Sequence, residues 1–181
     1  MLVKRQFSLN QKLKNSNIEK KIILNISLIC IAGLIIRFYY TPFGIPVSFD
    51  GFTGYFLYTL DISILGHLPN YTLSQSGWSE FLSLFFMNFH SENLIDYTDM
   101  QRTISVILSG ITVIPIYFIC KKFFNNYYSL IGATIFAFEP RIILNSTLGV
   151  AEPLYILAIS LGILLFLNLN KKIIYLSFGF F

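Results

Sequence analysis

The chain has little charge and very little cysteine. Charged residues make up 12% of its 181 residues, whereas a typical soluble domain carries about a quarter. The two cysteines, Cys30 and Cys120, lie in different apolar segments, so we expect no disulfide and no cysteine-based metal framework. The sequence also lacks a glycine-rich phosphate loop, a His-x-x-x-His pair and a nucleophile elbow. Nothing in it therefore supports ATP-driven chemistry.

Hydrophobic and aromatic residues take the place of the missing charge. They make up 55% and 17% of the chain, and the mean hydropathy is +0.66. Such a composition indicates an integral membrane protein that contacts membrane lipids. The net charge of +4 comes from short basic clusters beside apolar runs. This arrangement indicates membrane topology and no nucleic-acid partner.

Four apolar segments predict membrane spans at residues 22–40, 104–120, 123–138 and 153–168. A basic tail, residues 1–21, precedes the first span. A cleaved signal peptide is the rival interpretation, but the first run is long and ends in the aromatic collar Arg37-Phe38-Tyr39-Tyr40, which favours an uncleaved span. A fifth apolar run at residues 173–181 is interpreted as the start of a truncated span.

The basic residues alternate between the ends of these segments. With the N-terminus in the cytoplasm, ten basic residues lie inside, while Arg37, Arg102 and Arg141 lie outside with eight of the nine acids. This is the pattern of the positive-inside rule. We therefore predict an all-α, polytopic transmembrane protein of the plasma membrane, or of the endoplasmic reticulum in a eukaryote.

Residues 41–101 form the predicted outer loop. The loop contains two apolar stretches, Phe52–Leu65 and Trp78–Phe89, separated by the breaker sequence Gly66–Asn70. Both stretches are too short to cross the bilayer, so we expect two interfacial helices. The loop carries six acids and no Lys or Arg.

Asp50 is the leading catalytic candidate. It lies shortly after the first predicted span between Phe49 and Phe52, whose rings are expected to desolvate the carboxylate and make it a better general base. The alternative is an ordinary loop acid before a turn at Gly51. Glu152, at the start of the last predicted span, is a candidate second carboxylate that faces the same outer cavity as Asp50. The alternative, which can hold together with the first, is that Glu152 begins that helix before Pro153.

Arg141 and Arg102 are the candidate substrate-binding cations. Arginine suits a phosphate or pyrophosphate leaving group, and the alternative is contact with lipid headgroups. No metal site is predicted from these residues.

Several stretches resemble the N-terminal part of the GT-C superfamily of membrane glycosyltransferases. SFDGFTGY resembles the first-loop acid motif and the Phe-Asp-x-x-x-x-Tyr run of oligosaccharyltransferases, and QSGWSEFLSLFF resembles the second loop helix. The stretch from QRTISVILSG to VAEPLYILAI resembles the helical hairpin and third outer loop of protein mannosyltransferase-like members. The resemblance covers residues 22–181.

The resemblance implies transfer of a sugar from a polyprenyl- or dolichyl-phosphate donor to a protein or glycan acceptor, without a cofactor. Asp50 takes the place of the catalytic acid, and Glu152 that of the acid at the second outer turn. Gly51 stands where mannosyltransferases have a second acid. An oligosaccharyltransferase-like subunit, which needs a divalent metal, is one alternative, and a non-enzymatic membrane protein or inactive fragment is the other.

Overall fold

Every regular element that the structure describes is a helix, which confirms the all-α prediction. The computed structural model describes residues 2–68 and 77–168, with side chains from residue 19 onward. The elements are α1 (Leu2–Tyr40), α2 (Phe49–Gly51), the π-helix η1 (Phe52–Phe56), α3 (Leu57–Leu65), α4 (Gly77–Phe86), α5 (Leu94–Ile111), α6 (Val113–Phe123), α7 (Asn126–Phe138), α8 (Pro140–Thr147) and α9 (Glu152–Asn168). The predicted run at residues 173–181 lies outside the described residues.

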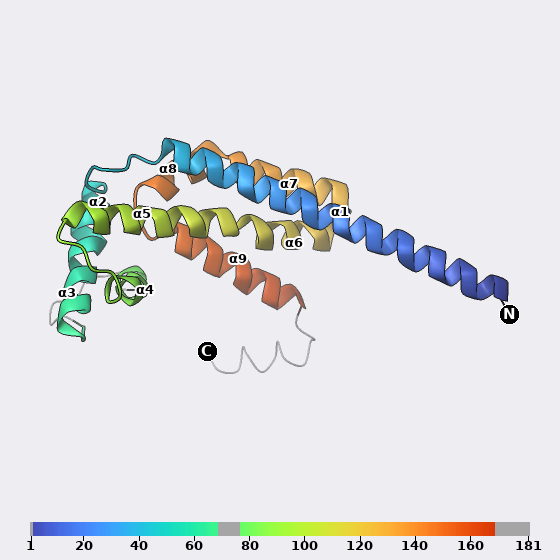
Figure 1. Cartoon of the computed structure of the whole chain (residues 1–181), viewed down its shortest axis with the longest axis horizontal. Coiled ribbons are helices and arrows are strands. Elements are labelled where there is room, and N and C mark those ends of the chain that lie inside the picture. The colour runs from blue at the N-terminus through green and yellow to red at the C-terminus, as the bar shows by residue number, and fades with distance from the viewer. Residues whose placement is uncertain (1, 69–76, 169–181) are drawn as a thin grey trace.

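The long helices form an elongated bundle with a cap of short helices at one end. Helices α1, α5, α6, α7 and α9 run along the bundle, while α2, α3 and α4 lie at the end where α5 begins (Figure 1). We call this the loop end. The opposite end, where α6 reaches Lys121 and Lys122 and α9 reaches Asn168, is the lysine end. Helix α1 has 39 residues, about 58 Å at 1.5 Å per residue, and extends beyond the bundle at its N-terminus (Figure 1).

Helices α5 and α6 are two parts of one long helix. The break at Thr112 precedes Pro115 by three residues. Pro115 has no amide proton, so the Ile111 carbonyl cannot receive the usual helical hydrogen bond, and the helix deviates there. The apolar residues on both sides keep the helix in the bundle, and the whole segment Leu94–Phe123 has 30 residues.

The helix bounds differ from the predicted spans at several places. Helix α1 begins at Leu2, twenty residues before the predicted start at 22, and α6 ends at Phe123 instead of 120. Helix α5 begins ten residues before the predicted start at 104, because Asn93 caps it by accepting a hydrogen bond from the Ile95 amide (3.0 Å) and Asp96 lies in its first turn. The segment between α1 and α5 is correspondingly shorter than the predicted loop. Helix α7 starts at Asn126 rather than at 123, because the Asn125 side chain accepts from the Tyr127 and Tyr128 amides.

Other boundaries agree more closely. The two predicted loop helices are present as the continuous segment Phe49–Leu65 and as α4. Gly66 ends α3 with a φ of 71°, as the breaker sequence predicts, and α9 extends the predicted segment 153–168 by one residue. Helix α8 was not predicted. It begins at Pro140 in the first turn, with the Glu139 carboxylate accepting from the Ile142 amide at 2.8 Å.

Arg37 is fully buried where α1, α5 and α7 meet. Its Nε donates to Ser109 Oγ (3.0 Å) and its Nη1 donates to the carbonyls of Ala137 (2.8 Å) and Gly33 (3.0 Å). The positive-inside pattern predicts that Arg37 lies on the outer side. The structure adds that its side chain joins three helices inside the bundle, because helix packing around α1 leaves its guanidinium no path to the surface.

Within residues 2–68 and 77–168, two helical segments are long and apolar enough to cross a membrane. They are Glu19–Tyr40, with 22 residues, and Leu94–Phe123. Helix α9 is apolar with 17 residues, at the lower limit for a span, and α7 has only 13 residues, which cover about 20 Å.

The core among α1, α6 and α7 is built from the buried residues Ile26, Val113, Tyr117, Ala133 and Ala137.

Candidate active site at the loop end

The segment after α1 is held against α5 by one arginine and one aspartate. Arg102 donates from Nη1 to the carbonyls of Pro42 (2.8 Å) and Ile45, and from Nη2 to the carbonyl of Pro46. Its Nη1 also lies 3.4 Å from the Asp99 carboxylate, which accepts a hydrogen bond from the Gly44 amide. These bonds fix the path of the chain toward Asp50.

The turn that carries Asp50 is docked on the turn before α9. Ser48 caps α2 by accepting from the Gly51 amide (3.1 Å), and its hydroxyl donates to the Leu148 carbonyl (3.2 Å). A β-carbon on Gly51 would lie 2.9 Å from that same carbonyl oxygen. The close approach leaves no room for a side chain, which gives a physical reason why a second acid does not follow Asp50 in this protein.

Gln101 joins the two turns, and Trp78 holds the second of them. The Gln101 amide donates to the carbonyls of Gly51 (3.3 Å) and Gly149, and Trp78 Nε1 donates to the Gly149 carbonyl at 3.4 Å. Gly149 has a φ of 73°, and a β-carbon there would lie 2.9 Å from Val47 Cγ1. Contacts across about one hundred residues of sequence thus place Asp50 and Glu152 at the same end of the bundle.

The π-helix η1 follows the turn that carries Asp50 and contains Tyr55. The Leu57 amide donates to the Phe52 carbonyl, five residues earlier, as is typical of a π-helix. The Tyr55 carbonyl accepts from the hydroxyls of Thr59 (2.7 Å) and Ser79 (3.0 Å). Helices α3 and α4 therefore both hold η1 in place.

Tyr55 lies near both predicted acids. A cavity of about 330 Å³ is lined by Tyr55, Ala151, Glu152, Tyr155 and Ile156. Burial raises the pKa of the Tyr55 hydroxyl, and the nearby Glu152, Tyr155 and Asp50 groups raise it further. Both carboxylates therefore influence the same phenol, but only Glu152 also lines the cavity.

The expected burial of Asp50 is not found. Asp50 is exposed, and so is Phe49, with 80% of its surface accessible. Phe52 stacks on Phe56, with ring centroids 5.2 Å apart, so its ring packs within the π-helix η1. The prediction that flanking rings would desolvate the carboxylate was wrong, because the helical turn points successive side chains in different directions.

The two predicted substrate-binding arginines differ in position. Arg102 is 2% exposed and uses its donors on the segment that leads to Asp50, so the structure does not offer it to a ligand. Arg141 is exposed in the first turn of α8. No contact in the described part of the chain joins Arg141 to Asp50 or Glu152, and α8 separates it from the turn at Leu148.

Three further residues belong to the site. Tyr155 lines the cavity one turn after Glu152, and Gln101 and Gly149 join the two turns. The spacing of Tyr155 from Glu152, three residues on one helix, was visible in the sequence. Gln101 and Gly149 had no comparable signal, because their roles depend on contacts between distant segments.

A metal centre lacks a full set of ligands here. Among residues 2–68 and 77–168 no three His, Cys, Asp or Glu side chains come together in a way that would hold a metal ion. Asp50 and Glu152 alone do not supply the several oxygen ligands that a divalent cation needs. The residues described thus do not fit the metal that an oligosaccharyltransferase-like enzyme requires.

Comparisons of the chain with protein-family models, with curated proteins and with solved structures gave no match.

Proposed function

We propose that the protein is a polytopic membrane glycosyltransferase of the GT-C type, or the N-terminal part of one. It would transfer a sugar from a polyprenyl- or dolichyl-phosphate donor to a protein or glycan acceptor on the outer face of the membrane. The observation that carries the proposal is a cavity at the loop end that is lined by Tyr55 and Glu152, with Asp50 on the adjoining turn and near enough to Tyr55 to interact with it electrostatically.

The exposure of the apolar helices supports the membrane setting. Only 17% of the most apolar window of Glu19–Tyr40 is buried in the bundle, and Ile23, Leu28 and Ile35 are each more than half exposed. Such a helix is stable where lipid covers the outward side chains, which distinguishes it from the core helix of a soluble protein. The lysine end then lies in the cytoplasm and the loop end outside.

Helices α7 and α9 complete the proposed four crossings. The 13 residues of α7 are shorter than a hydrocarbon core of about 30 Å. Its crossing therefore includes the residues that flank it on both sides, or it depends on a locally thinner bilayer. Helices α3 and α4 would lie at the outer interface, as two surface helices of the shortened loop.

The cavity has the character of a sugar-binding site. Tyr55 and Tyr155 supply flat apolar faces with polar tips, and Glu152 supplies an acceptor for sugar hydroxyls. In the transfer step the acceptor oxygen bonds to the anomeric carbon, the bond from that carbon to the phosphate oxygen breaks, and Asp50 takes the proton of the acceptor group. The lipid phosphate leaves with its negative charge.

Arg141 is the cation proposed for the donor phosphate. Its guanidinium is exposed and has no ion-pair partner among the described residues, so it is accessible to a phosphate that approaches along α8. Arg102 is not proposed for this role, because its contacts hold the segment before Asp50. Its part in catalysis is to position that segment.

The topology is tested by labelling single cysteines in a chain whose Cys30 and Cys120 are replaced by alanine. Glu92 and Lys20 are both exposed and lie near opposite ends of the proposed spans. A membrane-impermeant reagent applied from outside should label Glu92→Cys and leave Lys20→Cys unlabelled in intact cells. The reverse labelling, or labelling of both, would contradict the proposed orientation.

The activity is tested by supplying a labelled polyprenyl-phosphate sugar to membranes that contain the full-length protein. Glu152→Gln keeps the size of the side chain and the start of α9 but removes a charge from the cavity. We expect transfer to fall by about tenfold or more, with Glu92→Gln unchanged, because loss of one well-placed contact to the transition state costs about 1.4 kcal/mol per tenfold in rate. A normal transfer rate in Glu152→Gln would contradict the substrate-binding role and would leave Glu152 only a role at the start of α9.

A further inference from the structure

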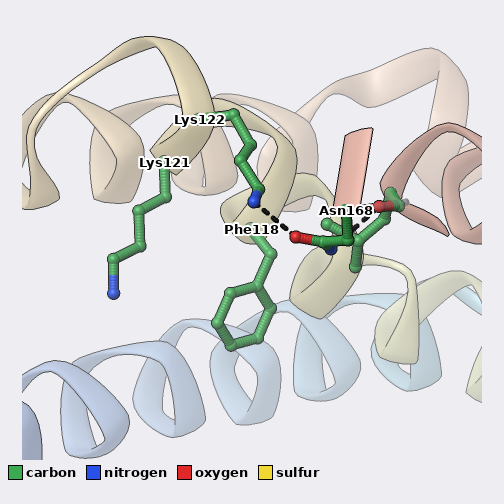
Figure 2. A pocket seen from close by; sticks show the side chains of 5 residues that line it. Phe118, Lys121, Lys122 and Asn168 are labelled. Carbon is green, nitrogen blue, oxygen red and sulfur yellow. Dashed lines mark hydrogen bonds between the residues drawn. The ribbon is translucent and has the colours of Figure 1, made fainter. Parts of the chain in front are cut away.

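A second cavity lies at the lysine end, opposite the candidate active site. It has a volume of about 500 Å³ and is lined by Phe118, Lys121, Lys122, Leu164 and Asn168. Helix α9 diverges from α6 toward this end (Figure 1), and the cavity occupies the space between their last turns (Figure 2). The proposed transfer reaction uses none of these residues.

The cavity combines an apolar wall with a cationic rim. Phe118 and Leu164 supply the apolar side, and the Lys122 ammonium donates a hydrogen bond to Asn168 Oδ1 (Figure 2). The Lys121 ammonium lies 5.9 Å from the centre of the Tyr117 ring. Neither lysine has a carboxylate partner among the described residues, so two positive charges at one pocket are uncompensated.

The position of the two lysines fixes the kind of partner that suits them. They follow the apolar segment that begins at Leu94 and ends at Phe123, so in the proposed topology their ammonium groups lie at the level of the inner headgroups. Anionic lipids are concentrated in that leaflet, and their phosphates attract basic side chains near the surface. A lipid also has the apolar chains that Phe118 and Leu164 require, which a free anion lacks.

We propose that this pocket binds one anionic phospholipid of the inner leaflet, with its phosphate against Lys121 and Lys122 and the start of its acyl chains against Phe118 and Leu164. The inference rests on the proposed membrane topology but not on the transfer reaction. The bound lipid would fill the space between α6 and α9 at the end where these helices diverge.

The test is the retention of lipid by the full chain. The protein is inserted into nanodiscs of phosphatidylcholine with an equal share of phosphatidylglycerol, transferred to mild detergent and analysed by native mass spectrometry. We expect one retained phosphatidylglycerol and little phosphatidylcholine. Lys122→Gln and Lys121→Gln should each reduce the preference about fivefold, since one basic residue near an anionic surface contributes about that factor.

Matched variants separate the pocket from general surface charge. Lys20→Gln removes an equally exposed lysine from α1 at the same end and should change the preference less than twofold. Leu164→Trp fills the cavity while keeping both charges and should abolish retention. Equal loss from Lys20→Gln and Lys122→Gln would overturn the proposal, as would equal retention of the two lipids by the unaltered chain.

Further outcomes distinguish a lipid site from a site for free anions, and this inference from the proposed topology. Displacement of the lipid by excess inorganic phosphate would mean a site for free anions and would overturn the lipid assignment. A chain that enters the nanodisc but shows no lipid preference overturns this inference alone, because insertion into the bilayer agrees with the proposed topology. A chain that does not enter the bilayer contradicts the proposed topology as well.

Discussion

Replacement of Gly149 by alanine tests whether the two turns that present Asp50 and Glu152 are held together as described. Gly149 has a φ of 73°, and its new β-carbon would lie 2.9 Å from Val47 Cγ1 and 3.3 Å from Gln101 Nε2. The left-handed backbone costs an alanine about 1–2 kcal/mol. Overpacking against Val47 adds about 1–3 kcal/mol, so we expect a total loss of about 2–5 kcal/mol.

Two other glycines separate these contributions. Gly66 has a φ of 71° but open space around its β-position, and Gly54 has open space and no positive φ. Gly66→Ala should therefore lose about 1–2 kcal/mol from the backbone alone. Gly54→Ala should be neutral or slightly stabilising, because alanine favours a helix over glycine by up to about 1 kcal/mol.

The chain carries its own reporter for this experiment. Trp78 is the single tryptophan, and its indole donates to the Gly149 carbonyl. Thermal unfolding in mild detergent, followed by tryptophan fluorescence, should show a Tm for Gly149→Ala about 4–20 °C below that of the unaltered protein, at about 2–4 °C per kcal/mol. An unchanged emission spectrum and a Tm equal to that of Gly54→Ala would refute the docking of the two turns.

Two more predictions concern the loop end. Arg102→Gln should lower the free energy of unfolding by about 1–3 kcal/mol, because the carbonyls of Pro42, Ile45 and Pro46 lose their donor. Arg141→Gln, at an exposed position, should change the free energy of unfolding by less than about 0.5 kcal/mol. Equal Tm values for the two variants would contradict the positioning role of Arg102. Because the pKa of Tyr55 is raised in the fold, its stabilising contribution is complete below the ordinary tyrosine pKa of about 10 and is lost as the pH rises through the raised value. The tyrosinate absorbance of Tyr55, identified as the part that Tyr55→Phe removes, should therefore appear above about pH 10. In Glu152→Gln this absorbance should appear at lower pH, because the neighbouring negative charge is gone. An unchanged titration would show that Glu152 does not act on Tyr55.

The sequence predicted the helices well where apolar periodicity and capping residues act locally. Gly66 ended α3, and the apolar run before Asn168 gave α9. It placed the start of α5 ten residues late, because the first turns of that helix are polar and only the capping by Asn93 identifies them. Helix α8 was missed because eight residues between two longer segments give too weak a pattern.

The candidate site was predicted only as two separate acids. The sequence indicated Asp50 and Glu152, but not the bonds from Gln101 and Ser48 that bring their turns together. It also predicted that Arg102 binds substrate, whereas in the structure the Arg102 side chain donates to three backbone carbonyls. Such contacts depend on which surfaces meet in three dimensions, and single-sequence patterns carry no information on that.

The central claim is that Asp50 is the base in transfer of a lipid-linked sugar. Asp50→Asn keeps the size and hydrogen bonding of the side chain and removes the proton acceptor, and its exposed position predicts normal folding. Initial rates of transfer from a labelled polyprenyl-phosphate sugar should be measured in membranes with matched amounts of full-length protein, with Asp61→Asn on α3 as the control. We expect Asp50→Asn to lose two or more orders of magnitude in rate, within the range of about 10²–10⁴-fold that general-base catalysis contributes. A loss below about threefold, with a larger loss in Asp61→Asn, would contradict the assignment of Asp50.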